Sequence, residues 1–455
     1  MKRRGLQGLP SQIKEQLITQ ALERRARSLE RDTELRKLQP ADARADETAA
    51  RSIIPERHCR FDLHPGYQQI RLIKEGAAKL GIEDPYFSTH GGIAGSHTRV
   101  AGRRMVNFSS YNYLGLSGDP RVAEAAKRAI DLYGTSVSAS RVVSGERPIH
   151  RELELALAEV YGVDDCVAFV SGHATNVTTI GCLFGPRDLV VHDALIHNSV
   201  LQGIQLSGAR RMSFPHNDWA ALDALLGARR RQFERVLIVV EGIYSMDGDF
   251  PDLPRFVEVK RRHRAFLMVD EAHSLGVMGP RGLGIREHFA LNGRAVDIWM
   301  GTLSKALAGC GGYIAGERAL VEHLKLAAPG FLYSVGMSPP VAAASLAALQ
   351  CLRAEPERVA ALQARGALFL RLAKQAGIDT GLSTGLAVVP AITGSSIKAA
   401  RLAHALRERG INVQPILYPA VDDKAARLRF FVCCDHTEPQ IEDTIAVLAE
   451  ELRGL

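Results

Sequence analysis

The chain has 455 residues, of which 46% are hydrophobic and 24% charged, and its net charge is +7. Such a chain can bury a large core, and the lack of any apolar run of about 18 residues excludes a membrane-spanning helix. The basic first residues lack the apolar stretch of a secretion signal, and the seven cysteines, an odd number without a CxxC pair, favour reduced thiols in a cytoplasmic protein.

The positive charge is concentrated at the N-terminus. Residues 1–60 hold 14 Lys/Arg and 9 Asp/Glu, so +5 of the net +7 lies there. Residues 11–38 are expected to form a charged amphipathic helix, followed by a linker over 39–60. The nearly balanced remainder argues against a nucleic-acid partner. The basic arm could contact an acidic carrier protein or a membrane surface peripherally, although a solvated helix is the simpler interpretation.

From about residue 120 onward, helical patterns alternate with short apolar runs. Helices are predicted at 120–133, 148–161, 194–207 and 217–232. Strands are predicted at 165–170, 188–192, 235–241, 265–270, 296–300 and 311–315. Apolar strands rich in Val and Ile between helices indicate an α/β fold with a mostly parallel sheet that helices cover on both faces.

The pattern changes after Pro339 and Pro340. Long helices are predicted at 340–377 and 395–410, with short strands near 385–392 and 427–433, which indicates a smaller α+β domain. The expected organisation is a basic arm and linker over 1–60, an N-terminal segment over 61–118, a large domain over 119–335 and a small domain over 336–455.

Two residues that follow predicted strands carry complementary chemistry. Asp270 ends the apolar run 265–269, and Lys305 lies shortly after the strand predicted at 296–300. Pyridoxal phosphate (PLP) needs an amine that holds it as a Schiff base and a carboxylate that keeps its pyridine nitrogen protonated, because only the protonated ring is a strong electron sink. The bound cation would keep the carboxylate ionised. The pair therefore predicts a PLP enzyme.

The string from Asp270 to His273 also occurs in the ATP-hydrolysing motif of some helicases. That interpretation requires a glycine-rich loop that ends in Lys-Ser or Lys-Thr. No lysine of this chain is followed by Ser or Thr, so the helicase interpretation is excluded.

A turn over residues 171–176 follows one predicted strand and begins a helix. Backbone amides at a helix N-terminus bind phosphate, and Gly172 would let the anion approach. The hydroxyls of Thr302 and Ser304 could bind the same phosphate. Taken alone, the turn is more simply explained as a structural one.

His197 begins another helix after a predicted strand. Its ring could lie on the PLP pyridine, or it could cap the helix or pack in the core. A third interpretation makes His192, Asp193 and His197 metal ligands, but these residues lack a firm ligand spacing, so no metal site is expected.

Two further polar residues follow predicted strands, and an arginine lies on the strand predicted near 427–433. Ser245 and His273 could donate to the phenolic oxygen of PLP or be ordinary turn residues. Strand alternation puts Arg427 and Arg429 on one face, opposite Leu428 and Phe430. Arg429 could bind a substrate carboxylate through two parallel hydrogen bonds, with a surface ion pair as the alternative.

In this order the motifs resemble the α-oxoamine synthases, a family of fold-type I PLP enzymes that includes 8-amino-7-oxononanoate synthase and serine palmitoyltransferase. The resemblance covers roughly residues 85–450. The matching segments are Tyr111–Gly115, Ser140 and Arg141 with Gly145 and His150, Ser171 and Gly172 with Asn176, His197, Glu241–Asp249, Asp270–Ser274, Gly301–Lys305, Phe331–Pro340, and Arg429 with His436 and Thr437.

The resemblance implies an aspartate aminotransferase-like fold and a role for each candidate. Lys305 would hold PLP and remove the α-proton, Asp270 would pair with the pyridine nitrogen, and His197 would stack on the ring. His273 and Ser245 would bind the phenolic oxygen. The phosphate would be bound by Ser171, Gly172, His173, Thr302, Ser304 and the partner subunit's Ser334. That last contact implies a homodimer with shared active sites.

Two substrate contacts and two departures follow from the same resemblance. Arg429 would bind the substrate carboxylate, and Asn112 would lie near the substrate entrance. Position 173 is often aromatic or apolar in the family, so the phosphate contact of His173 would come from its backbone. Members that bind alanine or glycine often have Asn where Tyr111 stands.

The implied reaction is a decarboxylative condensation of an amino acid with an acyl thioester, from coenzyme A or an acyl-carrier protein, to an α-amino ketone, carbon dioxide and a free thiol. Residues 111–113 favour a serine palmitoyltransferase-like enzyme that uses serine and a long acyl chain. The alternative is an 8-amino-7-oxononanoate synthase-like or polyketide-associated enzyme that uses alanine or glycine. An aminotransferase fits residues 331–340 poorly, and a PLP-binding regulator would carry a DNA-binding domain that residues 1–80 do not suggest.

Overall fold

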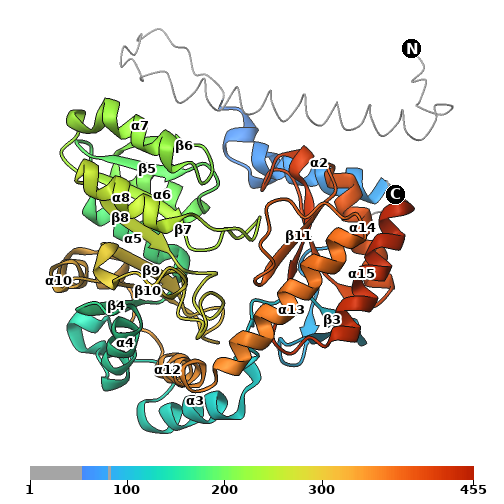
Figure 1. Ribbon diagram of the computed structural model, residues 1–455, viewed down its shortest axis with the longest axis horizontal. Coiled ribbons are helices and arrows are strands. Elements are labelled where there is room, and N and C mark those ends of the chain that lie inside the picture. Colours follow the sequence, from blue (N-terminus) through green and yellow to red (C-terminus); the bar gives the residue numbers. More distant parts are fainter. Residues whose placement is uncertain (1–53, 80–83) are drawn as a thin grey trace. The chain divides into compact units, whose positions relative to one another are not determined.

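The computed structural model describes residues 54–79 and 84–455 (Figure 1). The chain divides into two units, Met1–Glu75 and Gly76–Leu455. The helix predicted at 11–38 lies outside the described residues. The described part of the first unit contains short 3₁₀ turns at Glu56–His58 and Phe61–Leu63 and most of α2 (Pro65–Lys79), which has no buried residue.

A seven-stranded sheet in the order β4-β10-β9-β8-β7-β5-β6 forms the centre of the second unit. Its strands are β4 (Asp165–Phe169), β5 (Leu189–Asp193), β6 (Arg210–Phe214), β7 (Val236–Glu241), β8 (Phe266–Asp270), β9 (Ile298–Thr302) and β10 (Gly312–Gly316). Neighbouring strands from β9 to β6 are parallel, and β10 is antiparallel to both β9 and β4. The predicted mostly parallel sheet is confirmed.

The strand β6 was not predicted from the sequence. It is an edge strand whose Arg210, Arg211 and Ser213 are exposed, while Phe214 is buried. An edge strand has one neighbour, so it needs no continuous apolar run of the kind that marks the central strands.

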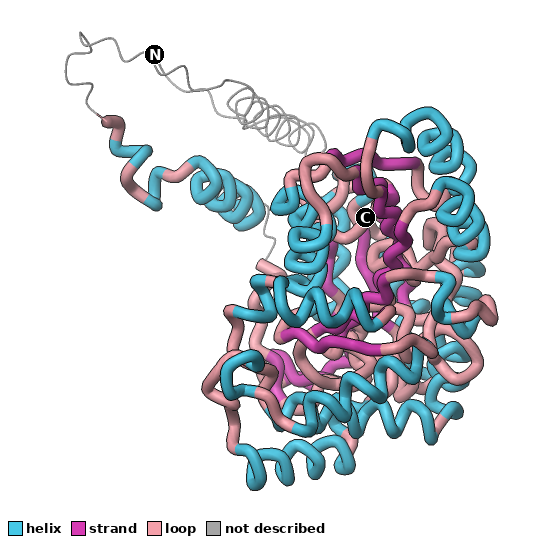
Figure 2. Tube along the Cα trace, turned by 90° about the vertical axis from the view of Figure 1, so that its left-hand side faces the viewer, coloured by secondary structure: helices cyan, strands magenta, loops and turns pink. Residues whose placement is uncertain are grey.

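Helices cover both faces of the sheet (Figure 2). The helices around the sheet are α4 (Pro148–Tyr161), α5 (Gly172–Leu183), α6 (Asn198–Ser207), α7 (Trp219–Arg229), α8 (Leu253–His263) and α10 (Arg318–Ala327), and α12 (Pro339–Ala354) packs on α4 and on α3 (Pro120–Tyr133). Successive residues of β7 enter two different cores: Ile238 packs in the same cluster as Phe256 of α8, and Val239 packs with Val200 of α6. Alternation of side chains along a strand produces this division.

A second group of strands and helices contains two smaller sheets and three helices that pack with them. One contains β1 (His90–Gly91), β2 (His97–Val100), β3 (Arg103–Asn107) and β12 (Ile411–Asn412), and the other contains β11 (Val388–Ile392), β14 (Arg427–Phe431) and β13 (Gln414–Ile416). The helices of this group are α13 (Pro356–Gln375), α14 (Ser396–Glu408) and α15 (Glu438–Arg453). They pack with β11 and β14 around a core that includes Phe108, Phe369 and Phe430.

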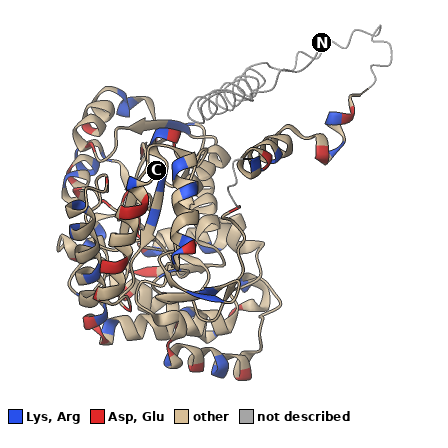
Figure 3. Cartoon of the chain, turned by 90° about the vertical axis from the view of Figure 1, so that its right-hand side faces the viewer, with Lys and Arg blue, Asp and Glu red and all other residues tan. Residues whose placement is uncertain are grey.

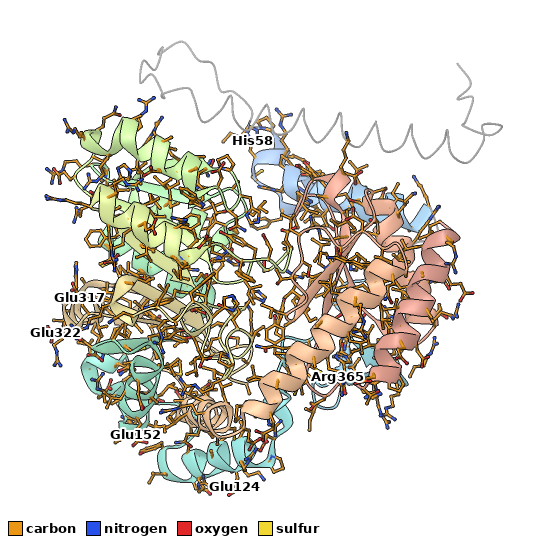
Figure 4. The ribbon with its side chains drawn as sticks, in the orientation of Figure 1. His58, Glu124, Glu152, Glu317, Glu322 and Arg365 are labelled. Carbon is orange, nitrogen blue, oxygen red and sulfur yellow. The ribbon has the colours of Figure 1, made fainter. Side chains whose placement is uncertain are left out.

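The long helix predicted at 340–377 is two helices. The chain breaks at Glu355, because Pro356 disfavours helical geometry in the residue before it. Helix α12 contacts α3 and α4, whereas α13 contacts α15 and β11. On α13, Arg365 donates to the backbone oxygen of His436 at 2.9 Å and pairs with Glu438, which joins α13 to the start of α15 (Figure 4). The boundary at residue 336 stays a prediction.

Acidic and basic residues are interspersed over the described helices (Figure 3). Glu124, Glu152, Glu317 and Glu322 are exposed, and Figure 4 labels them on the outer surface of the large sheet's helices. Within residues 54–79 and 84–455, no helix has the length and apolar character to cross a bilayer.

Candidate active site

The carboxyl ends of β5, β7, β8 and β9 meet at one edge of the large sheet. Each of these strands ends in a polar residue: Asp193, Glu241, Asp270 and Thr302. Parallel register pairs Glu241 with Asp270 directly. In open α/β sheets this edge is the usual place for a ligand.

The carboxylate of Asp270 is fixed by two hydrogen bonds. Asn176 Nδ2 donates to Oδ2 at 2.9 Å, and the backbone N–H of Ala272 donates to Oδ1 at 3.0 Å. The side chain is buried, with 5% of Asp270 exposed. Both bonds stabilise the ionised carboxylate that a PLP pyridine requires.

A short chain of hydrogen bonds connects Asp270 to His197. Asn176 Nδ2 also donates to Ser199 Oγ at 2.9 Å, and Ser199 Oγ lies 2.7 Å from His197 Nδ1. The backbone N–H of Ser199 donates to the same Nδ1 at 3.3 Å, so His197 caps α6 and carries its own proton on Nε2. Burial and the nearby Lys305 lower the pKa of His197.

Lys305 lies in the loop between β9 and β10 and is half-buried. Burial lowers the pKa of its amine to about 8, although Asp270 and Glu241 act in the opposite direction. Its Nζ lies 5.5 Å from the centre of the Tyr111 ring, a cation–π arrangement. Such an amine is a far better nucleophile and base near neutral pH than an exposed lysine.

His273 and Tyr113 form a buried pair beside this amine. Tyr113 Oη and His273 Nδ1 are 2.7 Å apart, and the His273 ring is stacked with Phe431 at 6.2 Å. Burial, with the positive charges of Lys305 and Arg429, keeps the pKa of His273 well below its usual value. A neutral imidazole whose Nδ1 accepts from Tyr113 can donate through Nε2.

The residues predicted to bind phosphate are close together at the start of α5. Ser171 caps the helix by accepting from the Ala174 N–H at 3.3 Å, and Thr302 Oγ1 donates to the Gly311 oxygen at 2.9 Å. A Cβ added to Gly172 would lie 2.9 Å from Thr302 Oγ1, so glycine is required for this approach. Ser304 and the side chain of His173 are exposed beside them, with the His173 ring 6.4 Å from that of His197.

Arg429 reaches the same site from β14. Leu428 and Phe430 are buried in the core of the small sheets, which confirms the predicted alternation. Arg429 Nη1 donates to the Ser245 oxygen at 3.0 Å, and Nη2 lies 3.5 Å from Tyr111 Oη. Ser245 therefore contacts Arg429 through its backbone.

A cavity of about 420 Å³ opens beside Lys305. It is lined by His90, Gly92, Ala94, Thr98, Asn107, Ser109, Ser110, Tyr111, Asn112, Ser117, Ser304, Lys305, Ala308, Gly309 and Gln414. The Asn112 amide is engaged with backbone: Nδ2 donates to the Ala94 oxygen at 2.7 Å, and Oδ1 accepts from the Ser117 N–H at 3.1 Å. Asn112 thus shapes the cavity wall by holding two neighbouring segments together.

Ser334, the residue predicted to reach the phosphate of a partner subunit, lies in the loop before α12. Its neighbours Tyr333 and Val335 are 86% and 52% exposed. His150 Nε2 lies 2.7 Å from the Met337 oxygen, and the Gly336 N–H donates to Ala139 at 2.9 Å, so the loop is held to the large domain. A role for Ser334 in a neighbouring subunit stays a prediction.

A family match and one known protein identify the relationship. Residues 103–448 match the family described as aminotransferase class I and II. The chain is 40% identical over 356 residues to the 8-amino-7-oxononanoate synthase of Symbiobacterium thermophilum, which covers 78% of this chain and 90% of that protein. The chain belongs to the α-oxoamine synthase family.

A solved structure of this family supports the fold. The serine palmitoyltransferase of S. paucimobilis with a bound PLP–myriocin aldimine has a TM-score of 0.82 and 28% identity, covering 86% of this chain and 99% of that one. A third relative, the 4-hydroxy-2,2'-bipyrrole-5-methanol synthase PigH of a Serratia strain, is 36% identical over 346 residues, 76% of this chain and 52% of that protein. The predicted fold-type I architecture, the PLP cofactor and the acyltransferase class are confirmed.

The degree of similarity to these relatives differs between the two predicted versions of the α-oxoamine synthase reaction. The reaction type is shared by both versions, but the 40% identity to an 8-amino-7-oxononanoate synthase exceeds the 28% identity to the serine palmitoyltransferase. The similarity therefore favours the alternative version over the serine palmitoyltransferase-like one that residues 111–113 suggested.

The site has the groups that PLP requires. Asp270 supplies a buried carboxylate, Lys305 an amine of lowered pKa, and α5 a helix N-terminus whose first N–H groups have no acceptor within the helix. Because residue 172 is a glycine without a Cβ, an anion can come close to the backbone at this N-terminus. Among the described residues, no cluster of His, Cys, Asp or Glu has the arrangement of a metal site.

Sequence reasoning missed the contacts of two residues of this α-oxoamine synthase site. Asn176 was included in a matching motif but given no role, although it links Asp270 to Ser199. Glu241 accepts from the His197 N–H at 2.7 Å, and burial beside Asp270 raises its pKa well above the usual value. Its position at the end of an apolar strand, like that of Asp270, was the available signal.

Proposed function

We propose that the enzyme condenses a small amino acid, alanine or glycine, with an acyl thioester and releases carbon dioxide and the thiol. The proposal is carried by the Lys305 amine, which lines the cavity, feels the charge of Asp270 and lies against the same Tyr111 ring as the Arg429 guanidinium. Tyr111 contacts both the amine and the guanidinium. A substrate with its nitrogen at Lys305 and its carboxylate at Arg429 must pass this ring, which favours a small side chain.

Each residue has a distinct task in this proposal. Bound PLP supplies the electron sink that stabilises negative charge at the α-carbon of the amino acid. Lys305 holds the cofactor, takes the proton from the α-carbon and later returns one to it. Asp270 would keep the ring nitrogen of PLP protonated, and His197, oriented by Ser199, would cover the ring. His273 and Ser245 would bind the phenolic oxygen.

The overall bond changes balance without a further reagent. The α C–H bond and the bond to the carboxylate break, and a bond to the acyl carbon forms. The C–S bond of the thioester breaks and the thiolate takes its proton from solvent, the carboxylate leaves as carbon dioxide, and Lys305 returns to the α-carbon the proton that it took, which completes the α-amino ketone.

The cavity beside Lys305 suggests the nature of the acyl donor. None of its lining residues is Val, Leu, Ile, Phe or Met, and Thr98, Asn107, Ser109 and Gln414 present hydroxyl or amide groups. Such a wall suits the amides of a pantetheine arm or a short or polar acyl chain better than a long alkyl chain. Coenzyme A and an acyl-carrier protein both provide that arm. The basic residues of 1–60 would favour an acidic carrier or membrane surface.

The amino-acid specificity is tested with carboxyl-labelled alanine, glycine and serine. Each is supplied to the PLP-loaded enzyme with acetyl, hexanoyl and palmitoyl thioesters of coenzyme A, and labelled carbon dioxide is measured. We expect release that depends on the thioester, with alanine or glycine preferred over serine and a shorter acyl chain over palmitoyl. Release without any thioester, or transfer of the amino group to a keto acid, would contradict the proposal.

Replacement of Arg429 by lysine is expected to raise the KM for the amino acid by about 10-fold to 100-fold, because a single ammonium cannot form the paired hydrogen bonds of a guanidinium. The value of kcat should change much less, since the carboxylate is bound in the ground state as well. Steady-state kinetics checks this. Arg409→Lys is the matched control, because Arg409 pairs with Glu450 on the surface between α14 and α15.

The lowered pKa of Lys305 predicts how cofactor uptake depends on pH. Covalent attachment of PLP needs the unprotonated amine, and with a pKa of about 8 roughly a tenth of the protein has this form at pH 7. The rate of uptake by cofactor-free protein should therefore rise about tenfold from pH 6 to 7 and level off above pH 8. Stopped-flow absorbance measures it. A rate that still rises between pH 9 and 10 would mean an ordinary lysine.

A further inference from the structure

His216 lies outside the residues assigned to catalysis but is bound between two buried carboxylates. Its Nδ1 is 2.9 Å from Asp193 Oδ1, and its Nε2 is 2.8 Å from Asp249 Oδ2. Asp193 is fully buried and 6% of Asp249 is exposed. Because both ring nitrogens face carboxylate oxygens, both must donate, and the ring is an imidazolium.

The two carboxylates belong to segments that approach the active site from different strands. Asp193 ends β5, and its carboxylate also accepts from the backbone N–H of Leu195 at 2.8 Å, in the turn that leads to His197. Asp249 closes the loop 244–249 after β7, where its backbone oxygen accepts from the Tyr244 N–H at 2.9 Å. His216 therefore connects the turn before His197 to the loop that carries Ser245.

The same loop contacts Arg429, the residue proposed to bind the substrate carboxylate. The backbone oxygen of Ser245 accepts from Arg429 at 3.0 Å, and that of Met246 accepts from Arg427 at 2.9 Å. Asp247 forms an ion pair with Arg427 at 2.6 Å. One side of the loop thus holds both arginines of β14, and the other side is held by His216.

We infer that His216 is a positioning residue that sets the place of Arg429 through the loop 244–249, and thereby controls binding of the amino-acid carboxylate. It touches neither Arg429 nor Lys305, so its effect passes through the backbone of Ser245 and Met246. This inference rests on the proposed carboxylate-binding role of Arg429.

The protonation of His216 agrees with this role. Burial alone would lower the pKa of the ring, but the hydrogen bonds and charges of Asp193 and Asp249 raise it to about 10. Asn217 Nδ2 also lies 3.4 Å from His216 Nε2, and the Tyr244 ring contacts the imidazole edge-on at 4.5 Å. With this pKa the ring is an imidazolium near neutral pH, the form in which both of its nitrogens donate.

The test compares His216→Gln with His263→Gln in the PLP-loaded enzyme. His263 is an equally suitable histidine, because its Nε2 lies 2.7 Å from Asp223 Oδ1 in the same domain but contacts no residue of the loop 244–249. A glutamine at 216 can reach only one of the two carboxylates. We expect His216→Gln to raise the KM for the amino acid about tenfold, with the visible cofactor spectrum and the KM for the acyl thioester unchanged. His263→Gln should leave all three as they are.

A double-mutant cycle with Arg429→Lys separates positioning from general destabilisation. If His216 acts through Arg429, the two substitutions together should raise the amino-acid KM by less than the product of their separate effects. Independent effects that multiply, or an equal loss in His263→Gln, would overturn the inference. A normal KM in Arg429→Lys alone would instead refute the proposed role of Arg429.

Asp249→Asn provides the second variant if His216→Gln does not fold. It keeps the size of the side chain and the contact between His216 and Asp193 but removes one of the two charges that hold the ring. The inference predicts the same rise in amino-acid KM with an unchanged cofactor spectrum. An unaltered amino-acid KM in this variant would overturn it.

Discussion

Replacement of Lys305 by alanine is expected to lower kcat by at least about 10³-fold, because the variant loses both the group that holds the cofactor and the base at the α-carbon. The purified variant should also lack the visible absorbance of covalently held PLP. Absorbance spectra and steady-state rates check the two expectations on one preparation. Burial lowers the pKa of the Lys305 amine to about 8. A lysine elsewhere in the described chain would lack this environment and could not replace it.

Lys398→Ala is the matched control for this variant. Lys398 is an exposed lysine on α14, outside the cavity residues. Its replacement should leave the spectrum and the rate unchanged. If Lys305→Ala retained the absorbance of covalently held PLP and a rate near that of the unsubstituted enzyme, another amine would have to perform these tasks.

Replacement of Asp270 by asparagine is expected to lower kcat by about 10²-fold to 10³-fold. A neutral amide cannot keep the pyridine nitrogen protonated, so the ring loses its capacity to accept electrons. The amide also conflicts with its surroundings, because Asn176 Nδ2 donates to Asp270 Oδ2 and an NH₂ group there would face another donor. Weaker PLP binding, measured by dialysis against limiting cofactor, should accompany the loss of rate.

Glu241→Gln tests whether the charge or the shape of the side chain matters at the end of β7, which lies beside Asp270 at the end of β8. Burial and Asp270 raise the pKa of Glu241 well above its usual value, which favours the uncharged form that a glutamine resembles. A glutamine keeps the oxygen that accepts from the His197 N–H. The rate should therefore stay within about threefold of the unsubstituted enzyme. An equal loss in Glu241→Gln and Asp270→Asn would contradict a specific role for the Asp270 charge.

The central sheet could be predicted from the sequence because its inner strands have no solvent-exposed face. Residues 236–240 and 267–269 are apolar throughout and buried on both sides. The edge strand β6 and the short strands β12 and β13 could not be found in this way. Their pairing depends on partners far away in the chain, as when Ile411 pairs with Val106.

The candidate site likewise contains residues that a local sequence pattern predicts and contacts that no local pattern predicts. Asp270, Lys305 and the turn at Gly172 have local signals: an apolar strand before a charge, or a glycine at a helix start. The hydrogen bond from Asn176 to Asp270 joins residues 94 positions apart. The contacts of His216 with Asp193 and Asp249 bring together the carboxyl-terminal sides of three different strands. No local pattern encodes such contacts, because the topology of the sheet creates them.

The most direct test is reduction of the PLP-loaded enzyme with borohydride, followed by proteolysis and mass spectrometry of the peptides. The account predicts one stable PLP adduct, on the peptide that contains Lys305, and a matching loss of activity. An unmodified Lys305 peptide, or an adduct on a different lysine in fully active enzyme, would contradict it.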